Sequence, residues 1–163
     1  MSRFTSLLTV SPLSDGKSWW LRTAFGYDVG REGSGDTVEV PIGFVTDFAS
    51  VPRPFWSFLP QWGRYGNAAV IHDFLYWQQT RTRRDADGIF LEGMNVLGVS
   101  GLVRYLIFTA VRAFGWLAWL NNRWDRQAGI NRVVDTGLEK ATDLPPARPG
   151  VIRHLVQGRP WRK

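Results

Sequence analysis

The chain has 163 residues, which is enough for one domain with its own apolar core and no disulfides or structural metal. It contains no cysteine, so disulfide frameworks, thiolate zinc sites and cysteine nucleophiles are excluded. Twenty Lys and Arg against fourteen Asp and Glu give a formal charge of +6, which favours phosphate-rich or anionic membrane partners over acidic ones.

The first part of the chain, residues 1–46, is predicted to be β-rich. Short β-favouring runs at 4–10, 19–25 and 37–42 are separated by turn-rich segments. This pattern predicts a small antiparallel sheet, built as a meander or as a pair of hairpins. Residues 47–66 follow without periodicity, and their Pro, Gly and aromatic content predicts an ordered loop packed on the core.

Residues 67–124 are predicted to be helical. Helical periodicity before and after a polar break at 79–83 predicts an antiparallel helix hairpin, with Asp85 as the candidate N-cap of its second helix. A third helix is expected from Gly101 to about Trp124, with Ser100 as a candidate cap.

The third predicted helix is nearly long enough to cross a membrane. Arg104 and Arg112 share one of its faces, and charges at that depth are costly in lipid. We therefore expect a buried core helix, with an interfacial amphipathic helix as the alternative, and not a transmembrane segment.

The end of the chain, residues 143–163, is a Pro/Arg-rich tail, which is ordered only when it packs against a partner. The complete prediction is an α+β fold with one domain over residues 1–142. It combines a small N-terminal antiparallel sheet, a packed loop, three helices and the extended tail.

The best candidate site lies in the predicted helix hairpin. His72 has apolar neighbours, and burying an ionisable ring is costly unless a partner satisfies it. Asp87 lies beyond the turn, where its side chain can meet that of His72. An imidazole oriented by a carboxylate is a general base that can activate water.

Asp73 and Asp47 are candidate metal ligands. Asp73 points about 100° away from His72 on the helix. If the loop that contains Asp47 folds back on the hairpin, these carboxylates and His72 converge on one hard or borderline cation: calcium, magnesium, manganese or zinc. A role for Asp47 in an Asx turn or as an N-cap is equally open.

A purely structural role for the same cluster is also open. His72 can be a core histidine tied to a backbone carbonyl or to Asp87, fixing the hairpin. Arg104 and Arg112 can be buried counter-ions of the nearby carboxylates. The cluster would then be a salt-bridge network without catalysis.

Part of the hairpin resembles the catalytic helices of secreted and prokaryotic phospholipase A2. The shared features are His72 followed by Asp73, Tyr76 four residues after the histidine, and Ala-Asp87-x-x-Phe90 on a second helix. The resemblance implies calcium-dependent hydrolysis of lipid esters. His72 would be the water-activating base, Asp87 the carboxylate behind it, Tyr76 a supporting hydroxyl and Asp73 a calcium ligand. The cysteines that flank the motif in that family are absent here.

A second resemblance extends over residues 38–119. Its blocks are Pro41-x-Gly-Phe-x-Thr-Asp-Phe-Ala-Ser-x-Pro52, His72-Asp-x-Leu-Tyr76, Arg84-x-Ala-Asp-x-x-Phe90 and Val111-Arg-x-Phe-Gly115. They resemble a family of small phage and prophage proteins of unknown function, which implies a phage-encoded accessory protein. The first residues lack a secretory signal, so we expect the protein in the host cytoplasm or in the virion.

The expected partners follow from these features. Other phage structural proteins would contact the tail and the aromatic surface, and an anionic membrane surface is a further candidate. Nucleic acid is less expected, because no DNA- or RNA-binding motif is present. The leading hypothesis is a metal-dependent hydrolase of the phospholipase type. The alternative is a non-catalytic structural or interaction component of a phage particle.

Overall fold

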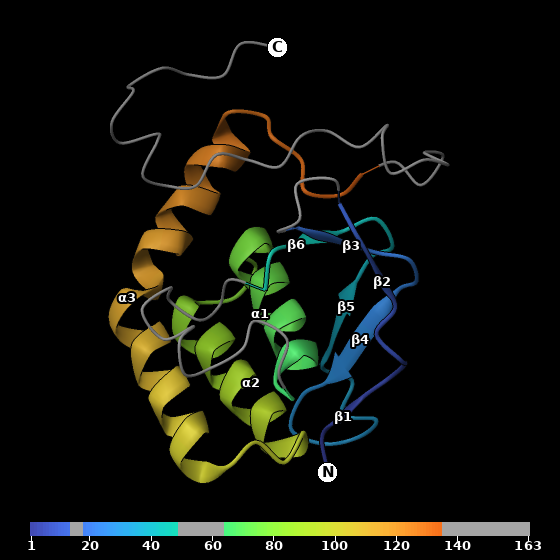
Figure 1. Cartoon of the computed structure of the whole chain (residues 1–163), viewed down its shortest axis with the longest axis vertical. Helices are drawn as coiled ribbons and strands as arrows, with labels where there is room; N and C mark the ends of the chain where they lie inside the picture. Colours follow the sequence, from blue (N-terminus) through green and yellow to red (C-terminus); the bar gives the residue numbers. More distant parts are fainter. Residues whose placement is uncertain (14–17, 49–63, 135–163) are drawn as a thin grey trace.

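The computed structural model describes residues 1–13, 18–48 and 64–134, and these form the α+β fold that the sequence predicts (Figure 1). Most of the predicted packed loop and the whole of the predicted tail lie outside the described residues. Two small sheets occupy one side of the molecule and three helices the other.

Within the described ranges the sheets contain six short strands: β1 Arg3–Phe4, β2 Val10–Pro12, β3 Trp19–Leu21, β4 Phe25–Asp28, β5 Thr37–Val40 and β6 Val45–Thr46. All pairings are antiparallel, in the orders β1-β4-β5 and β2-β3-β6. The predicted pair of hairpins is present as β2–β3 and β4–β5, each extended by a third strand.

The sequence analysis did not predict how the runs 4–10 and 19–25 are divided between the two sheets. Each run crosses from one sheet to the other, so that β1 and β4 pair in the first sheet while β2 and β3 pair in the second. Residues 22–24, where the second run crosses, are all exposed. Because the β-propensity of the residues is similar before and after each crossing, the sequence pattern does not show where the chain passes from one sheet to the other.

The helices are α1 Gly66–Gln78, α2 Arg83–Val96 and α3 Gly101–Gln127. The N-cap of α2 is Thr82 and not Asp85. The Thr82 hydroxyl oxygen accepts the backbone N–H of Asp85 at 3.1 Å and donates to the Asp85 carboxylate at 2.6 Å. Asp85 therefore occupies the third helical position of a reciprocal capping arrangement. Ser100 does precede α3, as predicted, but makes no side-chain cap hydrogen bond.

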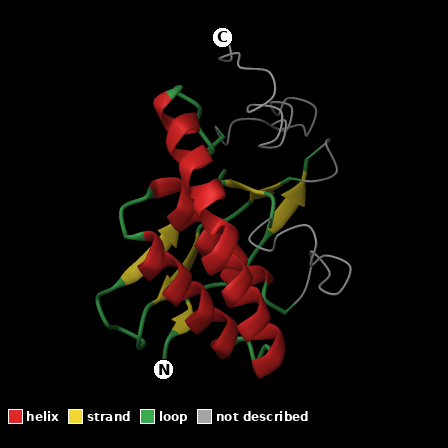
Figure 2. Cartoon of the chain, turned by 90° about the vertical axis from the view of Figure 1, so that its left-hand side faces the viewer, coloured by secondary structure: helices red, strands yellow, loops and turns green. Residues whose placement is uncertain are grey.

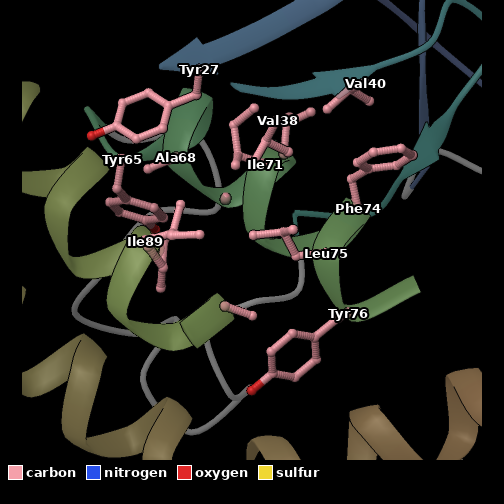
Figure 3. Packing of buried hydrophobic residues seen from close by; sticks show 14 of the residues in the cluster. Tyr27, Val38, Val40, Tyr65, Ala68, Ile71, Phe74, Leu75, Tyr76 and Ile89 are labelled. Atoms are coloured by element: carbon pink, nitrogen blue, oxygen red, sulfur yellow. The ribbon is translucent and has the colours of Figure 1, made fainter. Parts of the chain in front are cut away.

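Helix α1 forms the middle layer of the molecule. It contacts β5 and β6 on one side and α2 and α3 on the other, and nearly all of its residues are buried. Figure 3 shows Val38 and Val40 of β5 above Ile71 and Phe74 of α1. A helix that is buried on every side is expected to be mainly apolar. Any polar side chain that it carries needs a hydrogen-bonding partner inside the protein.

The prediction that α3 is a buried core helix is wrong for most of its surface. Only Ile107, Ala110, Val111 and Asn122 are buried. Helix α3 packs through one face on α1 and α2 and lies along the outside of the molecule, toward the viewer in Figure 2. Among the described residues it is the one helix that could cross a membrane by length and composition, and 17% of its most apolar window is buried.

Candidate functional site

His72 of α1 and Asp87 of α2 meet in the interior, as the hairpin geometry predicts. His72 Nε2 lies 3.0 Å from Asp87 Oδ1. The two residues are 2% and 0% exposed, so neither the imidazole ring nor the carboxylate is in contact with bulk water. A carboxylate with so little exposure persists only when most of its acceptor sites are filled.

Four side chains from all three helices fill those sites. The Tyr76 hydroxyl donates to Asp87 Oδ1 at 2.5 Å, beside His72. The other oxygen, Oδ2, accepts from Arg112 Nη1 of α3 at 2.6 Å and from Arg83 Nη1 at 3.3 Å. Arg112 is thus the counter-ion of Asp87, as one of the sequence hypotheses proposed. Arg104 has a different partner and donates to Asn95 Oδ1 at 2.6 Å.

The hydrogen bonds set the protonation state of the cluster. Burial alone would raise the pKa of Asp87, but the hydrogen bonds from His72, Tyr76 and Arg112 outweigh it and hold that pKa below its ordinary value. Burial, and then the neighbouring Asp87, raise the pKa of Tyr76 well above its ordinary value. Asp87 is therefore an ionised acceptor and Tyr76 a neutral donor near neutral pH.

This state also fixes the tautomer of His72. An ionised carboxylate can only accept hydrogen bonds, so the proton between the two groups belongs to His72 Nε2. In the neutral ring the lone pair then lies on Nδ1, the nitrogen that faces away from Asp87. As a base, the ring would act through Nδ1.

Aromatic contacts hold the histidine ring in place. The His72 ring stacks on Phe90 at 4.6 Å between centroids and contacts Tyr76 at 4.0 Å. The other side of Tyr76 meets Trp119 of α3 edge-on at 5.1 Å. Gly115 lies beneath the Tyr76 hydroxyl, where a Cβ would come within 2.5 Å of the oxygen. A side chain larger than hydrogen at 115 would displace Tyr76.

The candidate metal ligands lie on a different side of α1. Asp73 turns toward the sheets, where its Oδ2 accepts the Thr46 hydroxyl at 2.6 Å. Asp47 is the residue after Thr46 and is half-buried. Within the described ranges, no three His, Asp or Glu residues are grouped closely enough to hold a metal ion. A metal role for Asp73 and Asp47 stays a prediction.

Sequence analysis did not establish the contacts of three residues that shape this site. Arg83 of α2 donates to the backbone oxygen of Arg112 at 3.2 Å and so joins α2 to α3. Nothing in the sequence marked Thr46 as the partner of a carboxylate 27 positions later. Gly115 did leave a signal, since a glycine inside an apolar helix usually has a packing reason.

The model of a protein family, described as "Protein of unknown function (DUF1353)", matches residues 19–111. The chain belongs to this family. The DUF1353 match begins at β3 and ends inside α3, so it includes His72, Tyr76 and Asp87 and stops one residue before Arg112.

A relative in Sinorhizobium fredii (strain NBRC 101917 / NGR234), "Uncharacterized protein y4jT", is similar to this DUF1353 chain. The two are 38% identical over 78 residues, which cover 47% of this chain and 23% of the relative. The chain therefore matches less than a quarter of that relative's length. No solved structure matches the chain.

Proposed function

We propose that this protein is a phage-encoded accessory protein, associated with the virion, that hydrolyses a carboxylic ester of a lipid with His72 as general base. The observation that carries the proposal is the shared oxygen of Asp87, which accepts both His72 Nε2–H at 3.0 Å and the Tyr76 hydroxyl at 2.5 Å. These two contacts support the roles that the phospholipase A2 resemblance implies for His72 as base, Asp87 as the carboxylate behind it and Tyr76 as a supporting hydroxyl. The phage context is supported by the sequence blocks between residues 38 and 119.

The chemistry follows from the fixed tautomer. His72 Nδ1 would remove a proton from a water molecule as its oxygen attacks the ester carbonyl carbon. Asp87 would stabilise the resulting imidazolium, and the same proton would then pass to the departing alcohol oxygen. The products are a carboxylic acid and an alcohol. Arg112 and Tyr76 are positioning residues, since they keep Asp87 ionised and fixed.

The proposal is tested by hydrolysis of a fluorogenic phospholipid and of a soluble ester, with calcium present. His72→Gln keeps a polar side chain but removes the base, and His154→Gln, at the other histidine of the chain, is the matched control. We expect a rate loss of about 10²-fold or more for the first variant and none for the second. Wild-type protein without activity, or full activity in His72→Gln, would refute the hydrolase.

Metal dependence has a separate test. We propose calcium as the ion and Asp73 and Asp47 as its ligands, and no step above depends on it. Calorimetric titration with calcium and with zinc is compared between wild type and Asp73→Asn, which keeps the side-chain shape without the charge. Binding lost in Asp73→Asn supports the ligand role, while equal heats in both proteins contradict it.

A second candidate function is a structural or interaction component of a phage particle. The burial of the cluster favours it, since His72 and Asp87 are at most 2% exposed and Asp87 connects all three helices. The partners would be other phage structural proteins, contacted through the tail and the aromatic surface. Under this hypothesis, His72→Gln changes the unfolding temperature while wild type hydrolyses neither substrate, and the protein co-purifies with intact particles.

A further inference from the structure

Helix α3 presents an apolar face to the outside of the molecule. Its large exposed side chains are Leu102, Tyr105, Leu106, Phe114, Trp116, Leu117 and Trp124. Apart from Phe114, they recur at helical spacing and form one stripe, which we call the outer face of α3. Figure 2 shows the side of the molecule along which α3 runs.

The outer face carries no charge over most of its length. Between Gly101 and Asn122 the charged residues are Arg104 and Arg112, and both bond to α2, through Asn95 and Asp87. The polar residue of the stripe, Thr109, turns its hydroxyl back to the carbonyl oxygens of Tyr105 and Leu106 at 2.9 and 3.0 Å. An apolar surface of this length in a soluble domain marks an interaction site.

The net charge differs strongly between the sequence before α3 and the sequence from α3 onward. Residues 1–100 contain nine Lys and Arg and ten Asp and Glu, a net charge of −1. Residues 101–163, from the start of α3, contain eleven Lys and Arg and four Asp and Glu, a net charge of +7. The whole positive excess of the protein therefore belongs to α3 and the sequence that follows it.

We propose that the outer face of α3 docks on an anionic lipid bilayer, with the helix lying in the plane of the interface. Trp and Tyr side chains are favoured at the membrane–water interface because their rings are apolar while their N–H and O–H groups remain hydrated. Arg123, exposed near the C-terminal end of α3, would meet lipid phosphates. An apolar helical face next to basic residues is the pattern of interfacial helices on anionic membranes.

The contacts of α3 favour docking over insertion across the bilayer. Arg112 bonds to Asp87 at 2.6 Å, Gln79 Nε2 donates to the Trp119 oxygen at 2.7 Å, and Arg126 donates to the Trp77 oxygen at 3.2 Å. A spanning α3 would break all of these. Charge also disfavours a second copy of the chain as the binding partner of the outer face, because two α3 segments packed face to face would bring like charges together.

The test is flotation of the full-length protein with vesicles of ether-linked phosphatidylglycerol or phosphatidylcholine. Ether lipids contain no ester bond, so binding is measured independently of the proposed hydrolysis. The variant L106Q/L117Q changes two exposed leucines of the outer face, and Leu7→Gln is the matched control, because Leu7 is 87% exposed far from α3 in the sequence. Circular dichroism and the unfolding temperature verify that both variants fold.

We expect wild type and Leu7→Gln to float with phosphatidylglycerol, more weakly with phosphatidylcholine, and less in high salt. L106Q/L117Q should partition about tenfold more weakly or worse. Equal flotation of L106Q/L117Q, or no flotation of wild type, overturns the proposal. So does light scattering that shows a dimer dissociated by the same variant, and so does resistance of wild type to alkaline extraction, which would indicate insertion.

Discussion

Replacing Asp87 by Asn tests how strongly the buried carboxylate stabilises the helical layer. Asn keeps the shape and one acceptor oxygen but presents an NH2 group in place of the second oxygen. If the remaining oxygen serves His72 and Tyr76, the NH2 faces the guanidinium groups of Arg112 and Arg83, and donors then meet donors. The variant therefore loses the link to α3 and the charge that all four partners share.

The size of the effect is estimated from the exposure of the partners. Removing one member of a fully buried ion pair costs about 3–5 kcal/mol. The side chains of Arg112 and Arg83 are 36% and 24% exposed, so both guanidinium groups can recover part of their hydration. A charge-assisted hydrogen bond contributes about 1.5–3 kcal/mol. We expect Asp87→Asn to lower the free energy of unfolding by about 3 kcal/mol.

Urea denaturation and thermal melting measure this loss, and the melting temperature should fall by roughly 6–12 °C in a domain of this size. Asp85→Asn is the matched control, because it removes the same charge two positions earlier on α2, at an exposed cap. Its cost should stay below about 1 kcal/mol. Equal losses in the two variants, or less than about 1 kcal/mol for Asp87→Asn, would refute the argument that Asp87 organises the layer.

The same variant has a pH signature. The pKa of Asp87 is lower in the folded protein than in the unfolded chain. Its contribution to stability is therefore complete above the unfolded pKa, near pH 4, and is lost as the pH falls through the folded value. The stability difference between wild type and Asp87→Asn should be constant from about pH 5 to 7 and should shrink below about pH 4.

Three further substitutions have defined outcomes. Gly115→Ala places a Cβ 2.5 Å from the Tyr76 hydroxyl, so thermal melting should show a net loss of about 1 kcal/mol, the overpacking being partly offset by better helix propensity. Thr46→Val removes the hydroxyl that donates to Asp73 at 2.6 Å, and urea denaturation should show a loss of about 1–3 kcal/mol. Thr82→Ala removes the N-cap of α2 and should cost about 1 kcal/mol in the same assay, whereas no loss would contradict the cap.

The sequence predicted the elements of the fold better than their arrangement. The helix hairpin could be predicted because a polar break separates two periodic runs. The hairpins β2–β3 and β4–β5 could be predicted from their turn residues. The division of the strands into two sheets was not readable, because pairing depends on contacts distant in sequence. The run after Gly101 was expected in the core because it is apolar, but apolarity alone does not distinguish a buried face from one that meets a partner.

The candidate site shows the same division. The meeting of His72 and Asp87 followed from their positions on either side of the hairpin turn, and the distance of 3.0 Å between His72 Nε2 and Asp87 Oδ1 confirms it. The position of Asp73 relative to His72 also followed from helical geometry. The partner of Asp73 did not, because Thr46 reaches it through the packing of β6 on α1. Helical periodicity gives the direction of a side chain, and tertiary packing gives what the side chain meets.

Arg112 connects the candidate site to the surface that we propose for lipid docking, since it extends from α3 to Asp87 at 2.6 Å. Arg112→Gln removes this contact without changing an outer-face residue. If His72 is the base, Arg112→Gln should slow hydrolysis of a soluble ester and of a vesicle substrate by the same factor, because both need an ionised, fixed Asp87. L106Q/L117Q should slow only the vesicle reaction. Loss of both reactions in L106Q/L117Q, with its fold intact, would mean that the outer face supports the site itself and not the approach to lipid.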